Sequence, residues 1–180
     1  MHAESALIRR CLKNEPKAQV EFYKRFAPKM YGICIRFAKN KMEADDIMQE
    51  GFIKVFLNLN SYRGDGALEG WVRRTIVNTA INYYKRNLKY QNDLEIEKAD
   101  SLYSNDNGVL DSISVNDLIN LVQELPVGYR MVFNLNVIEG YTHKEIAEIL
   151  NISENTSKSQ LSRARQSLQT KVNELNIATY

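Results

Sequence analysis

A capped helix, a short turn and a second helix at residues 142–168 constrain the fold of this chain more than any other feature. Thr142 and Glu145 have the spacing of a capping box, in which each side chain bonds the backbone N–H of the other residue, so a helix begins here. The stretch 151–153 (Asn-Ile-Ser) has turn-forming composition, and Ser153 can cap a following helix. The spacing therefore predicts a helix-turn-helix.

The second helix of this unit has only a thin apolar seam. Residues spaced four, three and four apart are predicted to face inward: Ser157, Leu161, Ala164 and Leu168. The face predicted to point outward consists of Asn155, Ser159, Ser162, Arg163 and Gln166, with Lys158 and Arg165 on its flanks. Such amides, hydroxyls and guanidinium groups match base edges in the major groove, and the flanking cations match phosphates. A solvated surface helix is the alternative, but it would usually pair Glu with Lys, and residues 155–168 hold no acid.

Helical periodicity extends through most of the remaining chain. The 180 residues include only 3 Pro and 8 Gly, and no alternating run indicates a strand. Helices are predicted at 4–14, from Pro16 onward, at 44–58 and at 69–88, then from near 112 and from 126 to Gly140, with a loop at 61–70. Pro28 is expected to interrupt or kink the second helix. The predicted fold class is all-α, with one small helical domain at 5–89, a flexible acidic linker at 90–112 and a second domain at 113–175.

The net charge of +2 conceals a strong asymmetry along the chain. Residues 1–90 carry 17 Lys and Arg against 9 Asp and Glu, whereas residues 91–125 carry 1 basic and 8 acidic residues. A basic N-terminal half indicates a polyanionic partner. The acidic middle does not suit DNA binding and needs a separate explanation.

The segment from Gly70 to Lys89 is the second basic constellation. Its apolar residues recur at helical spacing and are predicted to be buried: Val72, Ile76, Val77, Ala80, Ile81 and Tyr84. The opposite face carries Arg74, Asn78, Asn82 and Lys85, flanked by Arg73, Arg86 and Lys89. Basic residues interleaved with Asn and Tyr suit phosphates and exposed bases. A solvated basic face is the alternative.

An acidic cluster, ADDIMQEGF, precedes it. Asp45, Asp46, Gln49 and Glu50 gather on the first turns of a predicted helix, and three explanations stay open. The acids complement the helix dipole, they form a docking face for a basic protein, or they bind magnesium and a diphosphate. Gly51 in mid-helix predicts close packing there, because glycine costs about 1 kcal/mol relative to alanine.

Several function classes lack the residues they need. Cys11 and Cys34 form no close-spaced pair, and with His2 and His143 they make too few ligands for a zinc site. We find no nucleophile–base pair, and no segment approaches the ~18 apolar residues of a membrane span. The expectation is a cytoplasmic, non-enzymatic protein with reduced thiols, no cofactor, no metal and no membrane insertion.

Two segments resemble a known family. The segment ADDIMQEGFIKVFLNLNSYRGDGALEGWVRRTIVNTAINYYKR is similar to region two of bacterial sigma factors, and LPVGYRMVFNLNVIEGYTHKEIAEILNISENTSKSQLSRARQSL is similar to their region four. Two such regions joined only by a short linker resemble the extracytoplasmic-function (ECF) group.

The resemblance implies partners and residue roles. Contacts with the β′ clamp helices of core RNA polymerase are implied for Asp46, Gln49, Glu50 and Phe52. The loop Ser61–Leu68 would capture a flipped base of the −10 element. The −10 contacts are implied for Tyr62, Arg63, Arg73, Arg74, Asn78, Asn82 and Lys85, and the −35 contacts for Asn155, Lys158, Ser159, Ser162, Arg163 and Arg165. The second domain would also seat on the β flap, and an anti-sigma factor would cover both DNA-facing surfaces.

Two positions depart from the family pattern, and two other interpretations remain. Ser157 stands where valine is usual, which weakens the apolar seam, and Gln160 stands where a basic residue is common, which removes a phosphate contact.

The linker of this family threads through the polymerase, where an acidic chain would act as a nucleic-acid mimic; a solvated spacer is the alternative. The chain could instead be an ordinary helix-turn-helix regulator with an N-terminal sensor domain, or a helical transferase using Asp45, Asp46 and Glu50 with magnesium.

Overall fold

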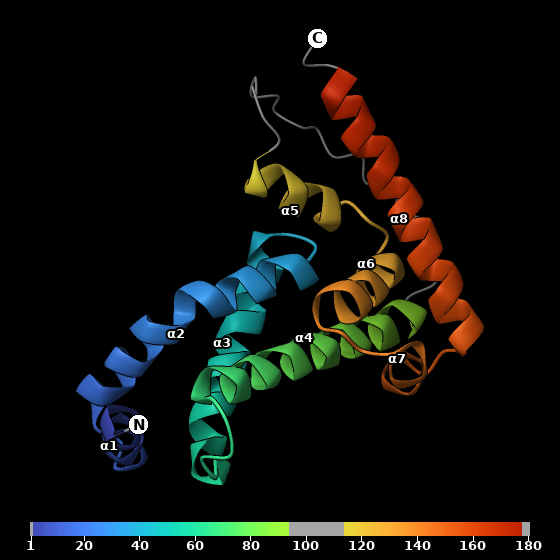
Figure 1. Cartoon of the computed structure of the whole chain (residues 1–180). Helices are drawn as coiled ribbons and strands as arrows, with labels where there is room; N and C mark the ends of the chain where they lie inside the picture. Colours follow the sequence, from blue (N-terminus) through green and yellow to red (C-terminus); the bar gives the residue numbers. More distant parts are fainter. Residues whose placement is uncertain (1, 94–113, 178–180) are drawn as a thin grey trace. The chain divides into compact units, whose positions relative to one another are not determined.

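The computed structural model describes residues 2–93 and 114–177, and within these ranges every regular element is helical (Figure 1). The all-α prediction is confirmed. The chain folds as two compact units, Met1–Tyr83 and Tyr84–Tyr180. Most of the linker predicted at 90–112 lies outside the described residues, so its limits remain a prediction.

The N-terminal unit is built from α1 (His2–Leu12), α2 (Pro16–Phe37), α3 (Lys41–Asn58), a 3-10 turn η1 (Leu59–Ser61) and the first part of α4 (Leu68–Asp93). The predicted stripe of α2 is buried: Phe22, Phe26, Met30, Ile33 and Phe37. The sequence predicted that Pro28 would interrupt or kink this helix, and α2 is not interrupted there. The buried side chains on both sides of the proline hold the helix together.

Helix α3 begins three residues earlier than predicted, because its cap was not recognised in the sequence. The side chain of Asn40 accepts a hydrogen bond from the Glu43 backbone N–H at 2.9 Å, and the Glu43 carboxylate accepts one from the Lys39 N–H at 2.8 Å. Asp45 and Asp46 therefore lie in the second turn, beyond the first-turn position where an acid best complements the helix dipole. This weakens the helix-dipole explanation for the acidic cluster.

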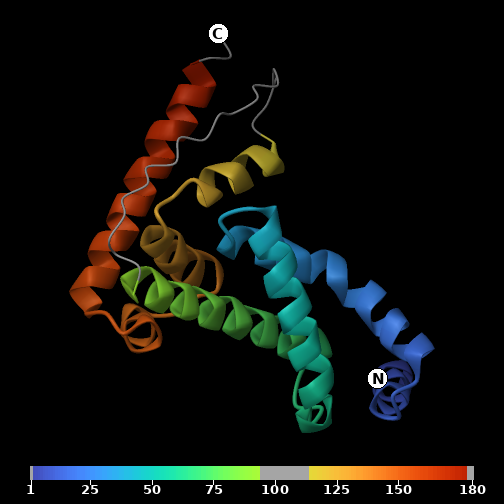
Figure 2. The ribbon, with the colours of Figure 1, turned by 180° about the vertical axis from the view of Figure 1, so that it is seen from behind.

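Helices α3 and α4 cross in close contact at Gly51 (Figures 1 and 2). A Cβ atom on Gly51 would lie 2.4 Å from Cδ1 of Ile76 and 3.8 Å from its Cα. Ile76 is fully buried, so it has little room to move away. The close packing predicted from this glycine is confirmed.

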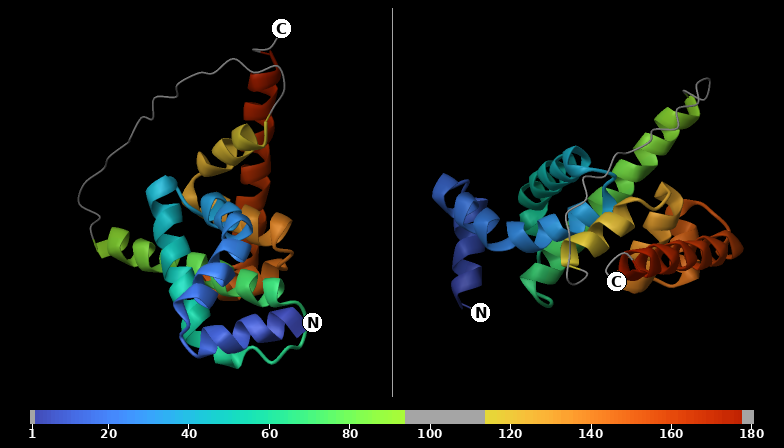
Figure 3. Two further views of the ribbon diagram at one scale, coloured as in Figure 1. Left: turned by 90° about the vertical axis from the view of Figure 1, so that its left-hand side faces the viewer. Right: turned by 90° about the horizontal axis from the view of Figure 1, so that it is seen from above.

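The second unit contains α5 (Val115–Gln123), α6 (Val127–Phe133), a π-helical turn η2 (Asn134–Ile138), α7 (His143–Leu150) and α8 (Glu154–Ile177). The π turn and Gly140, with φ +78°, end the helix that the sequence predicted from 126. Helix α8 continues nine residues beyond the predicted end at 168, with α5 beside its C-terminal half and an ion pair between Lys171 and Glu124 (Figure 3).

Candidate nucleic-acid interface

The helix-turn-helix is formed as the sequence predicts. The Thr142 hydroxyl accepts a hydrogen bond from the Glu145 N–H at 3.2 Å, and the Glu145 carboxylate accepts one from the Thr142 N–H at 2.8 Å. This backbone bond and a second from the Thr142 hydroxyl lower the pKa of Glu145. Helix α7 ends at Leu150, followed by Asn151 as its C-cap with φ +55°. The Ser153 hydroxyl accepts a hydrogen bond from the Thr156 N–H at 2.9 Å and caps α8.

The predicted phase of the recognition helix, residues 154–168 of α8, is confirmed. Ser157, Leu161 and Ala164 are buried and Leu168 is half-buried. All predicted outer and flanking residues are exposed: Asn155, Lys158, Ser159, Ser162, Arg163, Arg165 and Gln166. Lys158 forms an exposed ion pair with Glu154 at 3.5 Å. The outer face thus presents hydroxyl, amide and guanidinium groups to solvent; its contacts with DNA remain a prediction.

Ser157 is a buried polar member of the apolar seam, where the sequence predicted a weakened seam, and its hydroxyl has a partner on the facing helix. Its hydroxyl lies 2.9 Å from Nδ1 of His143, the first residue of α7, while the serine itself is fully buried. A buried hydroxyl needs such a partner, since an unpaired one is costly. From the sequence, His143 is considered only as a metal ligand. The sequence does hold a signal for this bond: Ser157 is a polar residue in the seam of one helix, and His143 is a polar residue on the facing helix.

Residues at the start of α6 lie against one flank of the recognition helix. A Cβ atom on Gly128 would approach the side-chain amide nitrogen of Gln160 to 3.2 Å. Nη1 of Arg163 donates a hydrogen bond to the hydroxyl of Tyr129 at 3.3 Å. Gln160 is half-buried, so the position that is commonly basic in the family faces α6 here.

Helix α4 presents the predicted polar face to solvent. Arg74, Asn78, Asn82 and Lys85 are exposed, whereas Arg73 is half-buried. The opposite stripe is buried at Val72, Ile76, Val77, Ala80 and Ile81, and Tyr84 is half-buried. Thr79 is buried as well, and its hydroxyl donates to the Thr75 carbonyl at 2.8 Å, which satisfies it within the helix. The face therefore has the donors and cations expected for a nucleic-acid strand.

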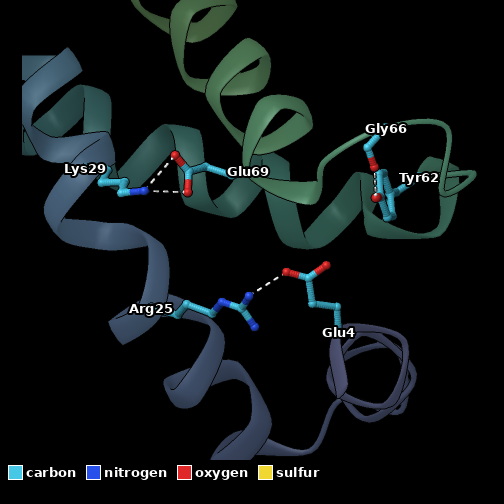
Figure 4. Close-up of polar contacts among 6 residues, drawn as sticks. All are labelled: Glu4, Arg25, Lys29, Tyr62, Gly66 and Glu69. Atoms are coloured by element: carbon cyan, nitrogen blue, oxygen red, sulfur yellow. Dashed lines mark hydrogen bonds and ion pairs between the residues drawn. The ribbon is translucent and has the colours of Figure 1, made fainter. Parts of the chain in front are cut away.

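The loop before α4 is closed on itself. The hydroxyl of Tyr62 donates to the carbonyl of Gly66 at 2.6 Å (Figure 4), and the Tyr62 ring packs 5.9 Å from the ring of Trp71. Gly64 and Gly66 have φ of +83° and +107°, which favour glycine. Arg63, which lies between Tyr62 and Gly64 in the sequence, is exposed.

Ion pairs tie the elements around this loop together. Nζ of Lys29 on α2 bonds both carboxylate oxygens of Glu69 on α4 at 2.9 and 2.7 Å, and Arg25 pairs with Glu4 of α1 (Figure 4). These pairs are exposed, so each contributes little stability. The Lys29–Glu69 pair links α2 to the first turn of α4, directly after the loop.

The acidic cluster on α3 is mostly exposed. Asp45, Asp46 and Gln49 are exposed; the Tyr31 hydroxyl donates to Asp45 at 2.8 Å, and that of Tyr83 to Asp46 at 3.4 Å. The bond to Asp45 raises the pKa of Tyr31. Glu50 forms an ion pair with Lys54 at 2.7 Å.

Phe52 differs from the other implied docking residues, because only 4% of it is exposed. Its ring packs edge-on against that of Tyr23 at 4.7 Å. Both rings line a mainly apolar groove between α2 and α3, together with Tyr31, Met48, Ile53 and Phe56 and with Asp45 and Gln49 of the acidic cluster. Phe52 therefore supports the groove beside the acidic cluster, and its exposed surface is too small for an extensive contact.

The cysteines lie in the core of the N-terminal unit. Burial raises the pKa of Cys34 to about 12 and also raises the pKa of Cys11. Among the described residues, no three His, Cys, Asp or Glu side chains lie together as metal ligands would. Within the same residues, no helix is long and apolar enough to cross a membrane.

Comparisons with known proteins match both units. Residues 22–89 match the family model of Sigma-70 region 2, and residues 116–168 match that of Sigma-70 region 4. The RNA polymerase sigma-H factor of Pseudomonas aeruginosa is 26% identical over 176 residues, covering 92% of this chain and 91% of that protein. The ECF RNA polymerase sigma-E factor of Escherichia coli K12 is 28% identical over 183 residues, covering 96% and 95%.

A solved structure has the same fold. The sigma factor RpoE of Bartonella quintana, determined in complex with the anti-sigma factor NepR, aligns with a TM-score of 0.50 at 21% identity, over 85% of this chain and 95% of that chain. The two family matches lie in the order region two, region four, and both relatives match along nearly their whole length. The chain therefore belongs to the sigma-70 family, in its extracytoplasmic-function group.

Proposed function

We propose that this chain is a sigma factor that binds core RNA polymerase, selects promoters and opens the −10 element. The observation that carries the proposal is the pair of polar faces in the N-terminal unit. The acidic cluster on α3 and the basic, asparagine-rich face of α4 belong to helices that cross at Gly51. An ordinary helix-turn-helix regulator would leave both faces without a role.

The proposed mechanism uses binding energy and no covalent step. The cluster of Asp46, Gln49 and Glu50 docks on the β′ clamp helices, with Phe52 supporting it from the groove. The closed loop with Tyr62 and Arg63 takes up an unstacked base, and the α4 face holds the melted strand. Extruding a base costs a few kcal/mol, which stacking and backbone contacts must offset. The strand contacts of α4 are assigned to Arg73, Arg74, Asn78, Asn82 and Lys85.

The second unit is proposed to read the −35 element. Asn155, Ser159, Ser162 and Arg163 lie on the outer face of the recognition helix, and Lys158 and Arg165 flank it. The outer groups contact base edges, and the cations contact phosphates on either side. The unit also seats on the β flap.

Regulation by an anti-sigma factor belongs to the same proposal. The relative from Bartonella quintana was determined bound to one, which supports such a partner here. It would cover the DNA-facing and polymerase-facing surfaces, so it and core polymerase should exclude each other. A stable ternary complex in size-exclusion chromatography would contradict this.

Run-off transcription tests the central proposal. The full chain is mixed with core polymerase and genomic fragments, and transcripts should start at a defined set of promoters only when the chain is present. Co-purification with core polymerase separates this function from that of a regulator, which binds DNA alone. Metal-dependent turnover of a diphosphate substrate would instead support the transferase. Because polymerase acts in the cytoplasm, the proposal places the chain there.

A further inference from the structure

The start of α6 and the flank of the recognition helix form one continuous strip. It consists of Gly128 and Tyr129 on α6 and of Gln160 and Arg163 on α8, and we refer to it as the α6–α8 strip. The two helices pack against each other along this flank. The family resemblance implies DNA contacts for α8 but no role for Tyr129.

The hydroxyl of Tyr129 accepts a hydrogen bond from the side chain of Arg163. Nη1 of the guanidinium donates to it at 3.3 Å, although Arg163 itself is exposed. An exposed arginine normally samples many rotamers, and each must be given up when it binds. A tyrosine has two side-chain torsions, and Tyr129 is half-buried, so its hydroxyl is a comparatively fixed anchor. The bond narrows the directions in which the rest of the guanidinium can point.

The remaining donors of Arg163 keep their fixed planar arrangement. A guanidinium has five N–H groups in a rigid fork, so using one of them at Tyr129 leaves a pair for a second acceptor. In the major groove, the acceptor pair that matches such a fork is O6 and N7 of guanine. A phosphate can accept the same fork, so the assignment to a base rests on the place of Arg163 among the exposed outer residues of the recognition helix, with Ser159 and Ser162.

Gln160 fills the neighbouring part of the strip. A Cβ at position 128 would approach its amide nitrogen to 3.2 Å, so the side-chain amide of Gln160 lies against the backbone of Gly128. The residue that departs from the basic family pattern therefore belongs to the contact between α6 and the recognition helix, beside the Tyr129–Arg163 bond.

We propose that Tyr129 is a specificity-determining positioning residue that presents Arg163 to one guanine of the −35 element. The inference rests on the proposed promoter reading by the recognition helix. In the alternative, the ring of Tyr129 only packs against α8, and removing its hydroxyl changes no base preference. In the proposed role, removing the hydroxyl alone lowers the preference for guanine.

The test measures base preference with the reconstituted holoenzyme. Templates carry a randomised −35 region, and transcripts are counted by sequencing for the natural chain, Tyr129→Phe, Arg163→Ala and the double variant. Arg163→Ala should lower the preference for guanine at one position about tenfold. Tyr129→Phe should lower it at the same position about threefold, the value of one ordinary hydrogen bond. The double variant should be no worse than Arg163→Ala alone.

Two further variants serve as controls. Tyr141→Phe makes the same chemical change at another half-buried tyrosine of this unit and should leave every preference unchanged. Arg163→Lys keeps the charge without the fork and should lose the guanine preference without unfolding the helix. Circular dichroism of the full chain should give the same melting curve for Tyr129→Phe as for the natural protein.

The outcomes separate the possible failures. Equal loss of transcription on all sequences in Tyr129→Phe, additive effects in the double variant, or an unchanged guanine preference would each overturn the role of Tyr129. Failure of the natural chain to direct any transcription would overturn the proposed function together with this inference. Selective transcription with a normal Tyr129→Phe profile would overturn the inference alone.

Discussion

The crossing of α3 and α4 makes a quantitative prediction about Gly51. In Gly51→Ala the new Cβ would lie 2.4 Å from Cδ1 of Ile76, well inside van der Waals contact. Alanine gains about 1 kcal/mol of helix propensity over glycine, whereas overpacking a core costs about 1–3 kcal/mol. The net change should be a destabilisation of about 0–2 kcal/mol.

Ile76→Val isolates the atom responsible. Valine lacks Cδ1, and the nearest remaining carbon of the side chain lies 3.7 Å from the Gly51 Cβ position, an ordinary contact. Alone, this change should cost about 0.5–1.5 kcal/mol. In the double variant the propensity gain is retained without the clash, so stability should return to within about 0.5 kcal/mol of the natural protein.

Urea unfolding followed by the fluorescence of Trp71 is the appropriate assay. Trp71 is the only tryptophan of the chain and lies on α4 in the N-terminal unit, so it reports that unit separately. Gly32→Ala is the matched control: it is also in mid-helix, but its Cβ would meet no atom within 4 Å, and it should stabilise by about 0.5–1 kcal/mol. Equal stabilisation by Gly51→Ala and Gly32→Ala would refute the steric argument.

Three further predictions concern charge. The double variant Asp46→Lys, Glu50→Lys should bind core polymerase more weakly than the natural chain, most of all at low ionic strength, where charges are least screened. The control variant Glu148→Lys, at an exposed acid of the other unit, should bind as the natural chain does. Equal, salt-insensitive binding by the natural chain and both variants would contradict the docking role. The pKa of Glu145 is lowered, so its stabilising contribution is complete above about pH 4.5 and is lost as the pH falls through the lowered value; Glu145→Gln should flatten this acid limb in thermal melts. Neutralising the acids of residues 93–111 to Asn and Gln should weaken holoenzyme assembly and change abortive products, and no change in either would leave the segment a spacer.

Sequence patterns predicted the elements whose signals are local. The spacing of Ser157, Leu161 and Ala164 fixed the phase of the recognition helix, and the Thr142–Glu145 pair fixed the start of α7. The start of α3 was missed although Asn40 followed by Glu43 has the spacing of a capping box, which is the signal in the sequence that could have found it. Helix ends were least predictable: α4 and α8 extend past their predicted limits, since neither sequence contains a stop signal there.

Contacts between elements could not be derived from periodicity. Phe52 has the position of a surface docking residue in the family motif, yet its ring turns toward Tyr23 because α2 lies on that side. The bond of Tyr62 to Gly66 depends on two backbone angles that the glycines allow but do not dictate. Arg163 was predicted to be exposed, and it is, but its link to Tyr129 joins residues 34 positions apart. Such pairings depend on how helices cross, which composition and spacing leave open.

The bond between Ser157 and His143 limits how this protein could be re-engineered by exchange of parts. A recognition helix transplanted from a relative with valine at this position would place a methyl group against Nδ1 of the imidazole, which is now 2.9 Å from a hydroxyl. The reverse transplant would bury a serine hydroxyl against a host helix that lacks the histidine. A chimaera joined in the turn between α7 and α8 separates the two partners, whereas one that carries residues 142–168 as a block keeps them together.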